Sequence, residues 1–176
     1  MILGGDLAPH GTVPEQRAFF REFLIPLLGE YRQEGGSADL FFIMGNDDWR
    51  ANLPVLLGAG LERFHHIHCA VRPLLEGAWV AGLASVGVTP FALKDWERWE
   101  EGIKPPARMD GFRSREDGSV HPFDFRAAEW EERLDRLLKI PARREARFIV
   151  QLEVDAVYGG DSMVGRYFGY RLHPLS

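Results

Sequence analysis

Five consecutive apolar residues at positions 40–44 constrain the fold of this chain more than any other feature of its sequence. A polar loop precedes the run and Gly45 follows it, so the run has the length of a strand rather than of a helix. An apolar side chain at every position indicates a strand with both faces buried, as in the interior of a parallel sheet. The run therefore predicts a central strand that other elements cover on both sides.

The rest of the chain alternates predicted helices with predicted strands. Apolar residues recur at helical spacing over 15–32, where Pro26 should kink or divide the helix. A short helix is expected near 50–60 and a longer one over 127–139. Further strands are expected at 64–71, 78–88 and 147–154, and the end of a short strand before Gly4. This order of elements predicts an α/β or mixed α+β fold.

A length of 176 residues suits a single domain over 1–176. Within it, residues 94–125 are rich in proline, glycine and charge, and we expect an irregular insert that Trp96 and Trp99 anchor to the body. The segment after Tyr158 shows no clear hydrophobic period.

Composition excludes several classes of protein. The chain has 21 basic and 26 acidic residues and a net charge of -5, which argues against a general nucleic-acid-binding surface. Cys69 is the single cysteine, so no internal disulfide is expected. No secretory signal and no apolar stretch of about 20 residues is visible, so we expect a cytoplasmic protein without a membrane span. Nothing in the sequence sets the oligomeric state.

Two segments share a pattern of apolar strand, glycine and acidic or amide side chain. One ends in Asp6, and the other continues from Gly45 into Asn46, Asp47 and Asp48. Ligands gather at the carboxyl ends of strands in α/β sheets, and hard divalent cations prefer oxygen ligands of this kind. The same dipeptides also form ordinary turns, which is the alternative interpretation of each segment taken alone.

Gly5-Asp6 and Gly45-Asn46-Asp47-Asp48 resemble the second and third signatures of the calcineurin-like metallophosphoesterases. Residues 2–11, 42–49 and 86–96 are also similar to one microbial branch of that family, and the resemblance extends over about 2–100. It implies a sandwich of two mixed sheets flanked by helices. It also implies a metal-dependent phosphoesterase that hydrolyses phosphate mono- or diesters with two divalent metal ions, Mn, Mg, Fe or Zn.

The resemblance assigns roles to particular residues. Asp6 would bridge the two metal ions and Asn46 would bind one of them. Asp47, which stands where the family usually has histidine, and Asp48 are the candidate catalytic carboxylates, in or just behind the metal's first ligands. His10 follows Asp6 in the loop that should face the metals, and is the candidate contact to a small phosphoester substrate.

The sequence departs from the family at three other places. No Asp-x-His precedes Asp6, Gln151 stands near the position of a family histidine, and no Gly-His-x-His occurs near the end. The alternative is therefore a truncated or degenerate, non-catalytic member that acts as a binding protein or has no activity. Asp6 and Asn46 favour the enzyme, and the missing histidines favour the alternative, so whether the chain is an enzyme stays open.

Two further clusters have simpler interpretations. His65, His66 and His68 lie beside Cys69, but a structural zinc site usually needs four ligands at defined spacings. We expect ordinary surface or partly buried histidines there. The basic residues at 143–147 are expected to form a solvated connection between a helix and a strand.

Overall fold

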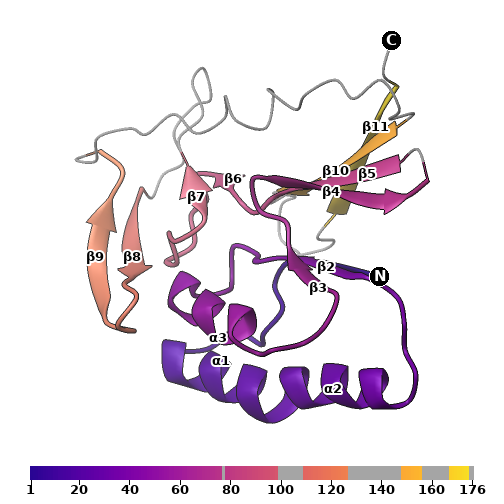
Figure 1. The fold of residues 1–176 in the computed structure, drawn as a ribbon. Coiled ribbons are helices and arrows are strands. Elements are labelled where there is room, and N and C mark those ends of the chain that lie inside the picture. Colours follow the sequence, from indigo (N-terminus) through magenta and orange to yellow (C-terminus); the bar gives the residue numbers. More distant parts are fainter. Residues whose placement is uncertain (77, 99–108, 127–147, 156–166, 175–176) are drawn as a thin grey trace.

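The computed structural model describes residues 1–76, 78–98, 109–126, 148–155 and 167–174 (Figure 1). Its first sheet has three parallel strands in the order β1-β2-β3, namely β1 Ile2–Gly4, β2 Leu40–Ile43 and β3 Phe64–His66. The central strand β2 is buried at all four positions, as the apolar run predicted. This strand therefore lies in the interior of the molecule, with other elements on both of its faces.

A second, mixed sheet has four strands in the order β11-β10-β5-β4. They are β4 Ala70–Leu75, β5 Ala78–Leu83, β10 Phe148–Asp155 and β11 Tyr167–Pro174. The strand expected over 147–154 is confirmed as β10, whereas β11 lies in the tail, where the sequence indicated no element. The eight-residue pairing of β11 with β10 is a long-range contact, which a local apolar pattern does not report.

The two sheets and the helices form layers, with the first sheet between the helices and the second sheet (Figure 1). A methyl group on Gly82 of β5 would lie 2.7 Å from the side chains of both Ile43 and Ile67. The sheets are therefore packed closely enough at this point to require glycine. The mixed α/β class is confirmed, although within the described residues the first sheet is parallel rather than mixed.

The helix expected over 15–32 consists of α1 Val13–Phe19, a π-helical turn η1 Phe20–Leu24, and α2 Ile25–Gln33. Thr12 and Glu15 form a reciprocal capping box at its start. Pro26 is the second residue of α2 and lies just after the π turn, because proline offers no backbone N–H and its ring crowds the carbonyl four residues earlier. The predicted division at Pro26 thus takes the form of a wider turn.

The strand expected over 64–71 is divided between the two sheets. β3 ends at His66 and β4 begins at Ala70, with Cys69 between them at a positive φ of 51°. The segment expected as one strand over 78–88 is likewise divided into β5 and the short β6 Val86–Gly87. Apolar content continues across both breaks, so the sequence pattern did not show them.

The described part of 94–125, namely 94–98 and 109–125, is more regular than expected. β7 Glu97–Arg98 pairs with β6, and β8 Asp110–Ser114 pairs with β9 Val120–Asp124 in an antiparallel hairpin. These strands are short and polar, so the alternation of apolar and polar residues along them is weak. Main-chain bonds in both directions between Phe112 and the 92–94 segment hold the hairpin to the body.

The remaining helical elements are η2 Arg50–Asn52 and α3 Leu53–Leu57, which confirm the short helix expected near 50–60. The helix expected over 127–139, Trp99 and the basic residues at 143–147 lie outside the described residues. In the part of the chain that is described, no helix is long and apolar enough to cross a membrane.

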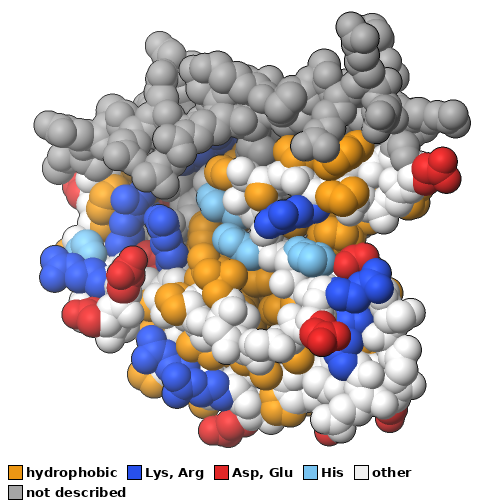
Figure 2. Space-filling view, viewed as in Figure 1, with side chains coloured by type: hydrophobic (Ala, Val, Ile, Leu, Met, Phe, Trp, Pro, Cys, Tyr) orange, Lys and Arg blue, Asp and Glu red, His pale blue; other side chains and the backbone are white. Residues whose placement is uncertain are grey.

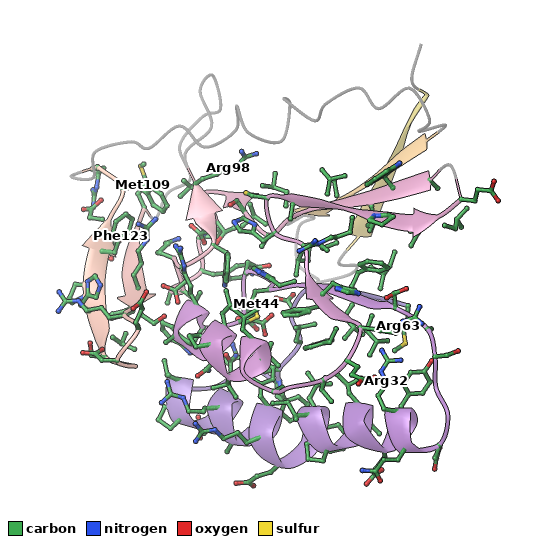
Figure 3. The ribbon with its side chains drawn as sticks, in the orientation of Figure 1. Arg32, Met44, Arg63, Arg98, Met109 and Phe123 are labelled. Atoms are coloured by element: carbon green, nitrogen blue, oxygen red, sulfur yellow. The ribbon has the colours of Figure 1, made fainter. Side chains whose placement is uncertain are left out.

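The core is built on the aromatic residues of β2. Phe42 is fully buried and its ring stacks on Phe64 of β3 with centroids 4.3 Å apart. Met44 continues the same apolar run into the interior, below the second sheet (Figure 3). The buried hydrophobic residues that form this core are Ala8, Phe20, Phe41, Phe42, Ile43, Met44, Leu56, Ile67, Val80, Ala84, Val86 and Trp96.

We expect Phe42→Ala to lower the free energy of unfolding by about 3–5 kcal/mol, because it removes a fully buried ring from a packed core. Urea unfolding followed by circular dichroism measures the change. Phe23→Ala is the matched control, since Phe23 is 54% exposed, and should change the same free energy by about 0.5 kcal/mol. Equal losses for the two variants would contradict the assignment of the core.

Candidate functional site

The two strand–glycine–acid segments meet at one edge of the first sheet. β1 and β2 are parallel neighbours, with Gly4 in register with Ile43. The loops that carry Asp6 and Asn46 therefore leave the same carboxyl edge. The two segments that share this pattern in the sequence thus lie next to each other in the fold.

The two loops approach each other so closely that Gly45 cannot carry a side chain. A Cβ at this position would lie 2.1 Å from the backbone nitrogen of Asp6 and 2.2 Å from its Oδ1 atom. Asp6 itself has a positive φ of 49°, and its Oδ1 accepts a hydrogen bond of 2.9 Å from the backbone N–H of Asp47. The orientation of the Asp6 carboxylate is thus set by the neighbouring loop.

Asp48 joins the loops from inside. Its fully buried carboxylate accepts hydrogen bonds from the backbone N–H groups of Gly45 (2.8 Å), Leu7 (2.9 Å) and Ala8 (3.0 Å). Burial raises the pKa of Asp48 to about 6, and the three N–H donors oppose that rise. A carboxylate committed in this way positions the loops, and it does not face a substrate.

Asp47 and His10 form a pair at the surface of the same edge. His10 Nδ1 lies 3.1 Å and 3.2 Å from the two carboxylate oxygens of Asp47. The side chain of His10 is 87% exposed and that of Asp47 is 19% exposed. Because a carboxylate only accepts hydrogen bonds, Nδ1 carries the hydrogen and the Nε2 atom is the one available to a ligand.

Gln16 is a residue of this region that the sequence analysis missed. Its fully buried side chain donates to the carbonyl of Asp47 (2.7 Å) and accepts from the N–H of Trp49 (2.9 Å). It lies one turn before Phe20 on the buried face of the helix. A polar side chain within an apolar helical stripe is the signal that could have revealed it.

The segment around Trp96 anchors the site to the rest of the molecule. Trp96 is buried, and its indole N–H donates to the carbonyl of Asp48 (2.8 Å), which agrees with the anchoring role expected for it. The fully buried ammonium of Lys94 lies 2.8 Å from Glu97 Oε2 and donates to the carbonyl of Thr89. Thr89 also donates its hydroxyl hydrogen to Glu97, so the charge pair has polar partners on both sides.

Oxygen donors of Asp6, Asn46 and Asp47 lie on this edge, with Asn46 half-buried in the turn between Gly45 and Asp47. Among the described residues, no group of three or more His, Cys, Asp or Glu side chains is arranged to hold a metal ion. Mg²⁺ commonly binds through one or two carboxylates and keeps several waters. The donors present therefore fit one hard cation, and they do not fit a closed two-ion cluster.

His65, His66 and His68, in β3 and the segment after it, are partly buried or have hydrogen-bond partners. No zinc site forms among the described residues. His65 Nε2 lies 2.9 Å from Asp39, which also pairs with Arg63 at 2.6 Å. His68 Nδ1 accepts from the N–H of Ala84, and burial lowers the pKa of His66. The expectation of surface or partly buried histidines is confirmed.

The ion pair of Asp39 and Arg63 lies away from the candidate site. Both residues directly precede their strands, so they occupy the amino edge of the sheet rather than its carboxyl edge. Arg32 reaches the carbonyl of Arg63 at 3.4 Å, and the two arginines lie near each other at the far end of α2 (Figure 3). The hydrogen bond from Arg32 connects the end of α2 to this edge of the sheet.

Comparison of the chain with protein-family models, with curated proteins and with solved structures finds no match. The resemblance to calcineurin-like metallophosphoesterases therefore stays a prediction from the motifs.

Asp48 makes a testable contribution to the dependence of stability on pH. Its raised pKa means that the folded chain binds more protons at this group than the unfolded chain between about pH 4 and pH 6. The stabilisation is complete below the unfolded pKa and is lost as the pH rises through 6. We therefore expect the wild type to lose more stability between pH 4 and pH 6.5 than Asp48→Asn, measured by urea unfolding.

Asp124→Asn is the control for this measurement. The hydrogen bond from Arg126 lowers the pKa of Asp124, so the stabilisation from this pair is present above the unfolded pKa and is lost as the pH falls. This variant should leave the slope between pH 4 and pH 6.5 unchanged. An unchanged slope in Asp48→Asn as well would show that Asp48 does not titrate in this range.

Proposed function

We propose that this chain is a metal-dependent phosphoesterase of the cytoplasm that hydrolyses a phosphate mono- or diester. The observation that supports the proposal is the placing of Asp6 and Asn46 on adjacent loops at one carboxyl edge, with the Asp47–His10 pair beside them. Oxygen donors next to an exposed imidazole suit a phosphate group that a cation neutralises. The single cysteine is in keeping with a reducing compartment.

In this proposal, Asp6 and Asn46 would hold a divalent cation, with Mg²⁺ or Mn²⁺ the best match to their oxygen atoms and Fe or Zn the other metals of the family. Such a cation, when bound, lowers the pKa of a water molecule and polarises a phosphoryl oxygen. The second ion expected from the resemblance needs ligands that the described residues do not bring to this edge.

The chain's own residues have separable roles. The N–H of Asp47 keeps Oδ1 of Asp6 turned toward the second loop, and the buried Asp48 keeps the loops together. Asp47 accepts the hydrogen bond from Nδ1 and so orients His10, and the imidazolium form of His10 can then donate from Nε2 to a phosphate oxygen. Of the two candidate catalytic carboxylates, Asp47 is the one that acts at the surface.

The second candidate function is a non-catalytic binding protein. It is favoured by the small number of donors on this edge, because the described residues supply no three-residue metal group and Asp48 is committed to backbone N–H groups. In that case the same edge would bind a phosphorylated molecule without hydrolysing it. Metal binding and turnover separate the two candidates.

The test uses Asp6→Asn, which removes the charge and keeps an oxygen that can accept from Asp47. Asparagine also tolerates the positive φ of this position. We expect the wild type to bind Mn²⁺ in calorimetry and to hydrolyse bis-(p-nitrophenyl) phosphate with Mn²⁺. Asp6→Asn should reduce both the affinity and the turnover by about 100-fold, because it removes a charged metal ligand.

Asp117→Asn is the matched control, since Asp117 is an exposed carboxylate in the turn of the β8–β9 hairpin, and should leave both quantities unchanged. If the wild type neither binds Mn²⁺ nor hydrolyses the ester, the phosphoesterase proposal is wrong. Binding of phosphate without turnover would then favour the binding protein.

A further inference from the structure

Two arginines lie on segments that meet next to the candidate site, one at the start of η2 and one in the hairpin. Arg50 follows Asp48 by two residues, and Arg113 lies in β8. One carboxylate, that of Asp95, accepts the backbone N–H groups of both Arg50 (2.8 Å) and Ser114 (2.7 Å). The N–H of Ala51 also donates to the hydroxyl oxygen of Ser114 (2.9 Å). The two segments are thus joined at this point.

Neither guanidinium is held by a carboxylate within the part of the chain that the structure describes. Arg113 donates from Nε to the carbonyl of Lys94 (3.0 Å) and from Nη2 to the carbonyl of Glu97 (3.4 Å), and both acceptors are uncharged. The Asp95 carboxylate takes its hydrogen bonds from backbone N–H groups and from the Ser114 hydroxyl. Lys94 and Glu97 neutralise each other.

Aromatic rings hold both guanidinium groups. The guanidinium carbon of Arg50 lies 5.6 Å from the centroid of the Trp96 ring, and that of Arg113 lies 3.5 Å from the centroid of Phe123. Contact with a ring uses the face of a guanidinium group and leaves N–H donors at its edges. Arg50 is exposed and Arg113 is half-buried, so at least one of the two heads is open to a ligand.

The two positive charges act on each other. Burial lowers the pKa of Arg113, the charge of Arg50 acts in the same direction, and Asp95 opposes both. Figure 2 shows Lys and Arg side chains gathered on the side of the molecule that carries the hairpin. An anion bound between the two guanidinium groups would reduce the repulsion between their charges.

We propose that Arg50 and Arg113 form a binding site for a phosphate-type oxyanion. Arginine is suited to this class of ligand because its planar fork matches the geometry of phosphate oxygens. Trp96 connects the site to the carboxyl edge, since it contacts Arg50 with its ring and donates to the carbonyl of Asp48. Given the proposed function, on which this step rests, the oxyanion is a second phosphate group of the substrate.

The binding site itself is tested without turnover. Calorimetry with sodium pyrophosphate in the presence of EDTA should show binding by the wild type. We expect Arg50→Gln and Arg113→Gln each to weaken it by about 10-fold, because each removes one charge-assisted contact. Arg21→Gln is the matched control, because Arg21 is an exposed arginine of the helical segment η1, and should bind as the wild type does.

Arg113→Lys keeps the positive charge and removes the planar guanidinium group, so it separates the effect of charge from that of two-point hydrogen bonding. We expect intermediate affinity, and the thermal unfolding midpoint reports separately the loss of the bonds that Arg113 makes to Lys94 and Glu97. Absence of pyrophosphate binding by the wild type would overturn the proposal. Affinity in Arg50→Gln equal to that of the wild type would overturn it as well, because the exposed Arg50 can be replaced without disturbing the core.

A kinetic measurement tests the assignment to the substrate. Arg50→Gln should raise KM about 10-fold for a phosphoester with a second phosphate group, and leave KM for p-nitrophenyl phosphate and both kcat values unchanged. Equal KM changes for the two esters would overturn the second-phosphate assignment. If the wild type hydrolyses neither ester but binds pyrophosphate through these arginines, the proposed function fails and the oxyanion site stands.

Discussion

The carboxylate of Asp48 is the interaction on which the candidate site depends. It lies in the interior and accepts three backbone N–H groups, one from its own loop and two from the loop after β1. A buried loop end without such an acceptor would leave these N–H groups unsatisfied, at about 1–3 kcal/mol each. The same bonds fix the distance between the loops, and this distance brings Asp6 to the backbone of Asp47.

The contact between the loops also explains the glycine at the end of β2. Any side chain on Gly45 would overlap the backbone and carboxylate of Asp6, so the closeness of the loops requires glycine there. Around this contact, Gln16 and Trp96 supply polar partners for the main chain of the second loop. The site is therefore built mainly from main-chain hydrogen bonds, and few of its carboxylates are available for a ligand.

The position of Trp96 relates the site to the β8–β9 hairpin. Its indole N–H binds the carbonyl of Asp48, its ring lies beside the guanidinium of Arg50, and the adjacent Asp95 binds the main chain of Ser114. Positive charge from the hairpin is thereby placed close to a carboxyl edge that carries several acidic residues. This distribution of charge is the observation that supports the proposed ligand with more than one anionic group.

The sequence by itself determined the buried strand at 40–44, the long helix with its division near Pro26, and the pattern shared by the two loops that carry Asp6 and Asn46. These features depend on local apolar content, on the missing N–H of proline and on the rule that parallel strands end at one edge. Only the tertiary structure decided that the carboxylate of Asp48 is buried while that of Asp47 lies at the surface. It also decided that residues 64–71 contribute a strand to each of two sheets, and that the segments of Arg50 and Arg113 are joined. Each of those outcomes depends on contacts between residues far apart in the chain, and a local pattern of residues does not specify such contacts.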